Sequence, residues 1–154
     1  MTNDVGHLII EASLIALSAR ERIPLREAAQ RLRDGDPYLH AEYRLALAWA
    51  VHHHLRKAHP GIEEVYVIGS TLEDRARRTS DLDLVILGAA FNETDEDALC
   101  EMNRSISEAY RQTVGGVPPD FELLDLHLVP SELGDHPYRR MLSGSNAATY
   151  RLPT

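Results

Sequence analysis

The chain has 154 residues and a hydrophobic content of 44%, enough for one domain with a buried core and too little for two full domains. Its formal net charge of −8 argues against an extended nucleic-acid surface, because binding along a phosphate backbone requires a basic footprint. The single cysteine excludes an internal disulfide, and we find neither a basic signal-peptide start nor an apolar run of roughly 18 residues. We therefore expect a cytoplasmic protein with no membrane association.

The first third of the chain has a helical pattern. Apolar residues recur every three to four positions over residues 4–20, which predicts a first helix. A second helix is expected between Pro24 and Gly35, in keeping with the preference for proline at helix starts and glycine just beyond helix ends. Pro37 begins a longer helix that runs to about His59.

After residue 60 the pattern changes from helical to extended. Residues 64–68, 82–87 and 121–129 are apolar or β-branched runs typical of strands. Residues 94–113 have a helical pattern, which we expect to begin with a capping box of Thr94 and Asp97 and to end at Gly115-Gly116. A short helical piece is expected over 136–142. This order of elements predicts an α/β (α+β) fold with a small mixed sheet.

Two aspartates stand at the start of the second predicted strand. Asp81 and Asp83 are one residue apart, so the strand period of two directs both carboxylates to the same face. Adjacent carboxylates repel each other unless a cation lies between them, and Mg²⁺ prefers carboxylate and phosphate oxygens. Taken alone the pair also fits a solvated strand start. Joined to the features below, it predicts a metal site.

A Gly-Ser pair ends the first predicted strand. Gly69 and Ser70 offer close backbone approach, free N–H groups and a hydroxyl, which are the groups that bind a polyphosphate. Ser70 with Glu73 also fits a helix capping box, and the pair alone does not decide between the two interpretations.

The third predicted strand supplies another carboxylate. Asp125 and His127 share the face opposite the leucines, so Asp125 is the best partner for the two aspartates. Glu122 has the parity of the leucine face and ranks below it. For His127, packing or support of a neighbouring ligand is favoured over direct ligation.

These motifs together resemble the DNA polymerase beta-type nucleotidyltransferase superfamily, most closely its minimal (MNT-type) members. The shared features are the Gly-Ser, a gap of ten residues, Ser-Asp-Leu-Asp-Leu over 80–84, and the later acid in an apolar strand. The resemblance covers about residues 65–129, with a weaker echo over 136–142. It implies helices packed on one face of the sheet in a domain over 37–154, with residues 1–36 as an additional N-terminal helical segment.

The resemblance also implies roles for individual residues. Asp81, Asp83 and Asp125 would hold Mg²⁺ or Mn²⁺ and carry the catalysis, and Gly69 and Ser70 would hold the triphosphate. The reaction would transfer a nucleoside monophosphate, AMP by expectation, from a nucleoside triphosphate to a hydroxyl on a protein, an RNA end or a small molecule.

One stretch departs from the family pattern. Minimal members often continue the Gly-Ser with Ala-Arg-Gly, whereas residues 72–74 here are Leu-Glu-Asp. Arg75 and Arg77, with Arg78, are the candidates to replace that arginine, because guanidinium groups donate bidentate hydrogen bonds to phosphate. A solvated loop is the equal alternative.

Other conspicuous residues favour structural roles. Consecutive histidines on a helix point in different directions, so residues 52–54 are expected to be solvated rather than to chelate a metal. Cys100 is expected to be a small core residue. Core positions at helical spacing are also expected for the aromatic residues Tyr38, Tyr43 and Trp49.

Two classes of function follow. The first is the nucleotidyltransferase. The second is a weakly catalytic or non-catalytic MNT-type interaction module, such as the antitoxin of a toxin-antitoxin pair that acts with a helical HEPN-type protein. The apolar residues of the first helix cover more than one stripe, so we expect part of that surface to remain exposed and to mark a homo-oligomer or a partner interface. The alternative is that residues 1–36 fold back over the long helix in a monomer.

Overall fold

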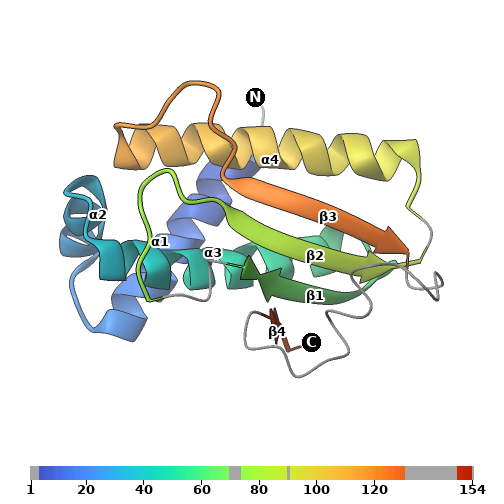
Figure 1. The fold of residues 1–154 in the computed structure, drawn as a ribbon, viewed down its shortest axis with the longest axis horizontal. Helices are drawn as coiled ribbons and strands as arrows, with labels where there is room; N and C mark the ends of the chain where they lie inside the picture. The colour runs from blue at the N-terminus through green and yellow to red at the C-terminus, as the bar shows by residue number, and fades with distance from the viewer. Residues whose placement is uncertain (1–3, 70–73, 90, 131–148, 154) are drawn as a thin grey trace.

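The computed structural model describes residues 4–69, 74–89, 91–130 and 149–153. The elements in chain order are α1 (Val5–Glu21), α2 (Leu25–Arg33), α3 (Pro37–Ala58), β1 (Ile62–Ile68), β2 (Leu82–Gly88), α4 (Glu93–Val114), β3 (Leu124–Pro130) and β4 (Thr149–Arg151) (Figure 1). The three predicted N-terminal helices are confirmed, as are the two strands and the helix that follow them.

The strands form a mixed sheet in the order β3-β2-β1-β4. β1 pairs antiparallel with β2, whereas β3 runs parallel to β2 after the chain returns through α4. The expected small mixed sheet is therefore confirmed. β4 was not predicted, because three residues are too few to show a period; it pairs antiparallel with the end of β1. Next to it, buried Leu152 donates its N–H to the Val65 carbonyl at 2.9 Å.

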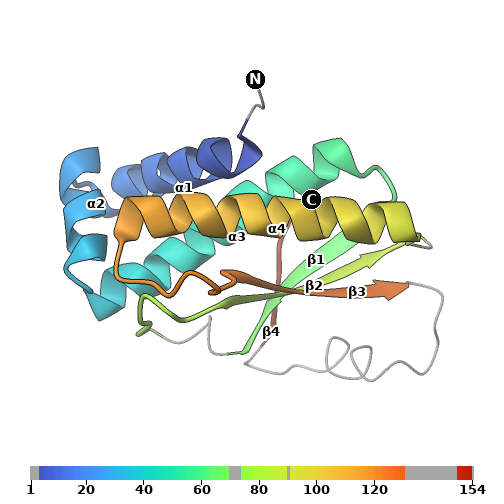
Figure 2. The same ribbon diagram turned by 90° about the horizontal axis from the view of Figure 1, so that it is seen from above.

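The helices lie on one face of the sheet (Figure 2), as expected. α3 contacts β1 and β2, and α1 packs across both α3 and α4. The α1–α4 crossing is close because Gly6 has no side chain: a Cβ there would lie 2.1 Å from the Ser105 carbonyl oxygen. A hydrophobic core of buried side chains from all four helices and from β1, β2 and β3 fills the space between the layers.

Two element boundaries differ from the prediction. The cap of α4 is Asn92, whose side chain forms a reciprocal capping box with Asp95, and not Thr94 with Asp97. β3 begins at Leu124 rather than residue 121: the Leu123 N–H donates to Ser107 Oγ of α4 instead of to a neighbouring strand, although the Leu123 carbonyl accepts the Leu82 N–H. The helical piece expected over 136–142 lies outside the described residues.

Four side chains are placed differently from the expectation. His52 is buried rather than solvated, because α3 is covered by α1 on one side and by the sheet on the other. Cys100 is exposed, since the core face of α4 carries its neighbour Leu99. Of the three aromatic residues expected in the core, only Tyr43 is buried; the exposed pair consists of Tyr38 and Trp49.

Candidate active site

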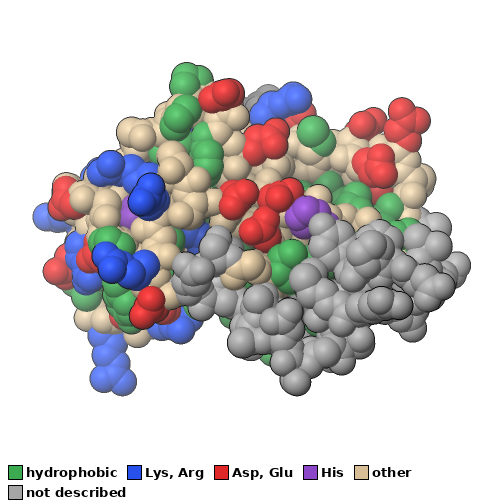
Figure 3. Space-filling model, viewed as in Figure 1, with side chains coloured by type: hydrophobic (Ala, Val, Ile, Leu, Met, Phe, Trp, Pro, Cys, Tyr) green, Lys and Arg blue, Asp and Glu red, His purple; other side chains and the backbone are tan. Residues whose placement is uncertain are grey.

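The starts of β2 and β3 bring two carboxylates together. Asp83 and Asp125 are direct register partners across the parallel β2–β3 pair. Leu82 and Leu84, on either side of Asp83, are fully buried on the helix side, so Asp83 projects from the opposite face as the period of two predicted. The acidic side chains gather over the starts of these strands (Figure 3).

A histidine completes this group. Asp83, Asp125 and His127 each offer one ligand atom, and these atoms lie within 4.8 Å of one another. His127 Nε2 is 3.3 Å from an Asp125 oxygen and 4.0 Å from an Asp83 oxygen. The sequence places His127 on the face of Asp125, one strand period further along, and favours packing or support of a neighbouring ligand over direct ligation.

The surroundings of the Asp83 carboxylate disfavour its charged form. Burial, its hydrogen bond with Asp125 and the charge of Asp81 raise the pKa of Asp83 to about 6, while His127 opposes the rise. Burial is the largest cause of the raised pKa, and the neighbouring carboxylates Asp81 and Asp125 add to it, so a cation at this point would stabilise the charged form of Asp83. Carboxylate oxygens with one imidazole nitrogen are donors that Mg²⁺ or Mn²⁺ accepts, so the group fits a divalent cation.

Asp81 lies beside this cluster. It precedes β2 and is half-buried, and its charge contributes to the raised pKa of Asp83. Among the described residues, the tight ligand group contains His127 where the sequence suggested Asp81. Glu122 precedes β3 and is exposed.

Gly69 brings backbone close to the Asp83 carboxylate. It has a positive φ of 72°, and a Cβ built on it would lie 3.1 Å from an Asp83 carboxylate oxygen. Close backbone approach to this carboxylate therefore depends on glycine. Ser70 lies outside the described residues.

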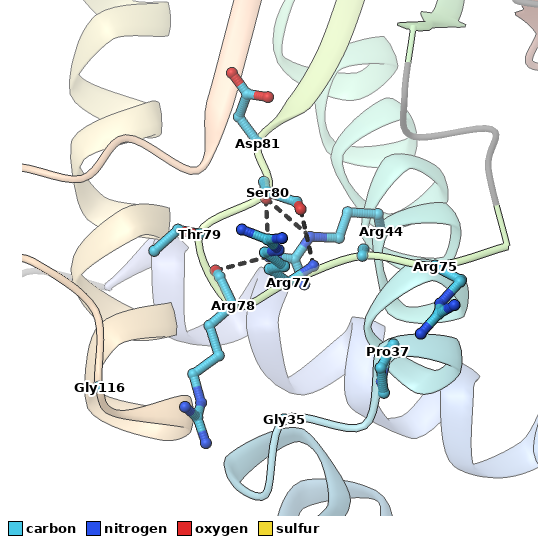
Figure 4. Close-up of a pocket in the computed structure, with 11 residues that line it drawn as sticks. Gly35, Pro37, Arg44, Arg75, Arg77, Arg78, Thr79, Ser80, Asp81 and Gly116 are labelled. Carbon is cyan, nitrogen blue, oxygen red and sulfur yellow. Dashed lines mark hydrogen bonds between the residues drawn. The ribbon is translucent and has the colours of Figure 1, made fainter.

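The segment before β2 lines a cavity of about 790 Å³ next to the acids. Arg75, Arg77 and Arg78 line it together with Asp81, and Arg75 and Arg77 are exposed (Figure 4). The opposite parts of its wall come from Gly35 before α3, from Pro37 at the start of α3, and from Gly116 after α4. The arginines thus form a cationic cavity beside the acidic cluster in a chain of net charge −8.

A buried arginine of α3 holds this segment in place through hydrogen bonds to its backbone. Arg44 is fully buried and donates to the Ser80 carbonyl at 3.0 and 2.8 Å and to the Arg78 carbonyl at 2.9 Å. It also donates to the Tyr110 hydroxyl and to His40 Nδ1. Burial and the charge of Arg44 lower the pKa of His40 to about 4, so neutral His40 accepts from Arg44 and donates through Nε2 to the Leu32 carbonyl.

Sequence reasoning missed Arg44. The only available signal was a cation within the apolar pattern of the long helix, between Leu39 and Leu47, and its partners come from distant parts of the chain. Two further backbone bonds hold the same segment: Ala76 N–H donates to the Pro37 carbonyl at 3.0 Å, and Arg77 N–H donates to Ser80 Oγ at 2.8 Å.

A mixed sheet covered by helices on one face, with paired aspartates on adjoining strands and a glycine beside them, is the arrangement expected of the fold that the sequence motifs resemble. The family model of the nucleotidyltransferase domain matches residues 53–134, more than half of the chain. The chain belongs to this family, and the resemblance to polymerase beta-type nucleotidyltransferases is confirmed at that level. Membership of the family supports a general role in nucleotidyl transfer and implies a nucleoside triphosphate as substrate.

Comparisons with curated proteins and with solved structures gave no match. Over the described residues, none of the helices combines the length and the apolar character that a membrane span requires.

Proposed function

We propose that this protein transfers a nucleoside monophosphate, AMP by preference, from a triphosphate to a hydroxyl acceptor, with Mg²⁺ or Mn²⁺ held by Asp81, Asp83 and Asp125. The observation that carries the proposal is the register pairing of Asp83 with Asp125 beside the backbone of Gly69. In this arrangement the carboxylates that would bind the cation lie beside the backbone that the phosphates would approach.

The two paired aspartates suit different parts of the reaction. The bound cation would neutralise charge that develops on the α-phosphate. The side chain of Asp83 is 21% exposed and that of Asp125 is 52% exposed, so Asp125 faces the side from which an acceptor arrives. Asp125 takes the proton of the acceptor hydroxyl, whose oxygen bonds to the α-phosphorus as the bond to pyrophosphate breaks.

We assign the triphosphate to Gly69, Ser70, Arg75 and Arg77. Both arginines are exposed in the cavity beside Asp81, and no ion pair holds either of them within the described part of the chain. Free guanidinium groups next to a metal-binding face suit phosphate oxygens. They support the idea that the arginine of the usual family motif is replaced from a position further along the chain.

Covalent transfer of label tests the activity. The protein is incubated with each α-labelled triphosphate and Mg²⁺, with and without cell extract, beside the Asp83→Asn variant as a control. We expect label from ATP to become covalent with the parent alone. Equal incorporation by parent and variant, or none with any triphosphate, would contradict the proposal.

A second candidate is an interaction module, such as an MNT-type antitoxin with a helical HEPN-type partner, or a homo-oligomer. The observation that favours it is exposed apolar surface on the helical layer: Leu8 is 60% exposed and Ile15 is 52% exposed on α1, one face of which also carries exposed Ala12. Light scattering at micromolar concentration of the parent and of Ile15→Glu tests self-association. A monomer in both cases would contradict the homo-oligomer.

A further inference from the structure

Arg78, like the buried Arg44, is an arginine of the cavity that the proposed triphosphate site does not use. Figure 4 shows it on the side of Gly116, whereas Arg75 lies on the opposite side near Pro37. Gly116 belongs to the segment that leads from α4 to β3, the strand that carries Asp125. Arg78 therefore lies where the cavity meets this segment.

The surroundings of Arg78 hold its guanidinium in place without neutralising it. The Arg78 side chain lies between Gly35 and Gly116, two glycines with positive φ. Cβ atoms built on them would lie 3.5 and 3.6 Å from the nearest guanidinium atoms of Arg78. One Nη donates to the Arg33 carbonyl. Its Nε is buried and has no hydrogen-bond partner among the described residues. This enclosed N–H does not face the cavity, but the other Nη has no acceptor among the described residues and is the donor that an anion in the cavity would use.

Arg44 adds a second fixed charge. It lines the same cavity, is fully buried, and all its hydrogen-bond partners are neutral: backbone carbonyls, the Tyr110 hydroxyl and neutral His40. Its bonds to the Ser80 and Arg78 carbonyls also fix the backbone that carries Arg78. Positive charge held in place before a ligand arrives is the arrangement that favours an anion.

We propose that this side of the cavity binds a phosphate group of the acceptor, so that the acceptor is a phosphate-bearing molecule with a free hydroxyl. The inference rests on the proposed nucleotidyl transfer, because it names the acceptor class. The acceptor phosphate takes no part in bond changes; it is held by Arg78 while the hydroxyl lies near Asp125. A cavity of about 790 Å³ suits a phosphorylated sugar or the terminal nucleotide of a chain.

Calorimetric titration without metal tests this site directly. The probes are ribose 5-phosphate and a trinucleotide with a 5′-phosphate, each beside its counterpart without the phosphate. We expect the parent to bind a phosphate-bearing probe and not its counterpart, and we expect Arg78→Gln to weaken that binding at least about tenfold. The matched variant Arg75→Gln should change it less than threefold. The two probes distinguish a small phosphorylated acceptor from a nucleic-acid end.

Titration of Mg²⁺-ATP into the same proteins separates this inference from the proposed function. We expect Arg78→Gln to change Mg²⁺-ATP affinity less than threefold and Arg75→Gln to weaken it. Phosphate binding that survives Arg78→Gln, or an equal loss of Mg²⁺-ATP binding, would overturn the acceptor site alone. A parent that does not bind Mg²⁺-ATP would overturn the proposed function, and the acceptor assignment with it. Thermal unfolding verifies the fold, and Arg78→Lys, which keeps the charge, should retain part of the phosphate binding.

Discussion

The backbone of Gly69 and the carboxylate of Asp83 are in such close approach that a methyl group on Gly69 would lie 3.1 Å from an Asp83 oxygen. We expect Gly69→Ala to cost about 1 to 3 kcal/mol of stability, because φ is +72° there, and also to weaken metal binding. Gly115 is the matched control, with φ of +74° and no atom within 4 Å of a Cβ. Gly115→Ala should lose stability and keep metal affinity. Equal metal affinity in both variants would contradict a role for the Gly69 contact.

Binding of metal and triphosphate should stabilise the fold through Asp83. At a concentration one hundred times Kd, the gain by mass action is about 2.7 kcal/mol, or roughly 5 to 10 °C in Tm. Asp83→Asn preserves the shape of the side chain and removes its charge, so the gain should disappear while the fold remains. Differential scanning fluorimetry with Mg²⁺ or Mn²⁺ and ATP measures it. The same shift in variant and parent would exclude Asp83 as a ligand.

The nearness of His127 to both aspartates predicts a preference among metals. Imidazole nitrogen suits Mn²⁺ better than Mg²⁺, whose ligands are oxygens. We expect His127→Asn to lower Mn²⁺ affinity about tenfold and Mg²⁺ affinity less. Mn²⁺ electron paramagnetic resonance gives free and bound metal directly. Asp81→Asn serves as the comparison, and it should weaken both metals to a similar degree.

The raised pKa of Asp83 makes the stability of the metal-free protein depend on pH. Its pKa is about 6 in the folded state against 3.8 as the ordinary value, so the folded state binds more protons between these values. Stability therefore falls as pH rises through that window. Asp83→Asn should be more stable than the parent above pH 6 by about 1 kcal/mol after allowance for solvent screening, and the difference should vanish below about pH 4.

The difference between variant and parent is the quantity to measure by urea unfolding. The lowered pKa of His40, about 4 against 6.5, acts in the opposite direction, since stability from that group is lost as pH falls below 6.5. This contribution is common to both proteins and cancels. A difference that stays constant from pH 4 to pH 7 would show that Asp83 titrates normally.

Removal of Arg44 should destabilise the protein strongly. Arg44→Met leaves the Ser80 carbonyl and the Tyr110 hydroxyl without their donor and removes one of the two donors to the Arg78 carbonyl, which keeps its bond from the Tyr110 hydroxyl; the change should cost about 3 kcal/mol or more. The control is Arg104→Met, because Arg104 is exposed and pairs only with exposed Glu101 at 3.0 Å among the described residues. That change should stay within about 0.5 kcal/mol. Similar unfolding midpoints for the two variants would contradict the anchoring role.

The sequence alone determined the helices, the central strands and the face on which the aspartates lie. Pro24, Gly35 and Pro37 mark helix ends through their own backbone preferences. Asp83 and Asp125 alternate with leucines that pack toward the core, so the period of two placed each aspartate on the opposite face of the sheet. These features are local, because each depends on neighbours within a few residues.

The tertiary structure decided which other residues these side chains contact. The parallel register set Asp83 opposite Asp125, and β4 formed only because β1 offered an edge to pair with. Arg44 is a buried anchor because residues 78, 80 and 110 come to it from distant segments. The exposure of Trp49 and the burial of His52 were decided in the same way, by which faces of α3 the sheet and α1 cover. No local pattern encodes such contacts, since they arise when elements far apart in the chain pack together.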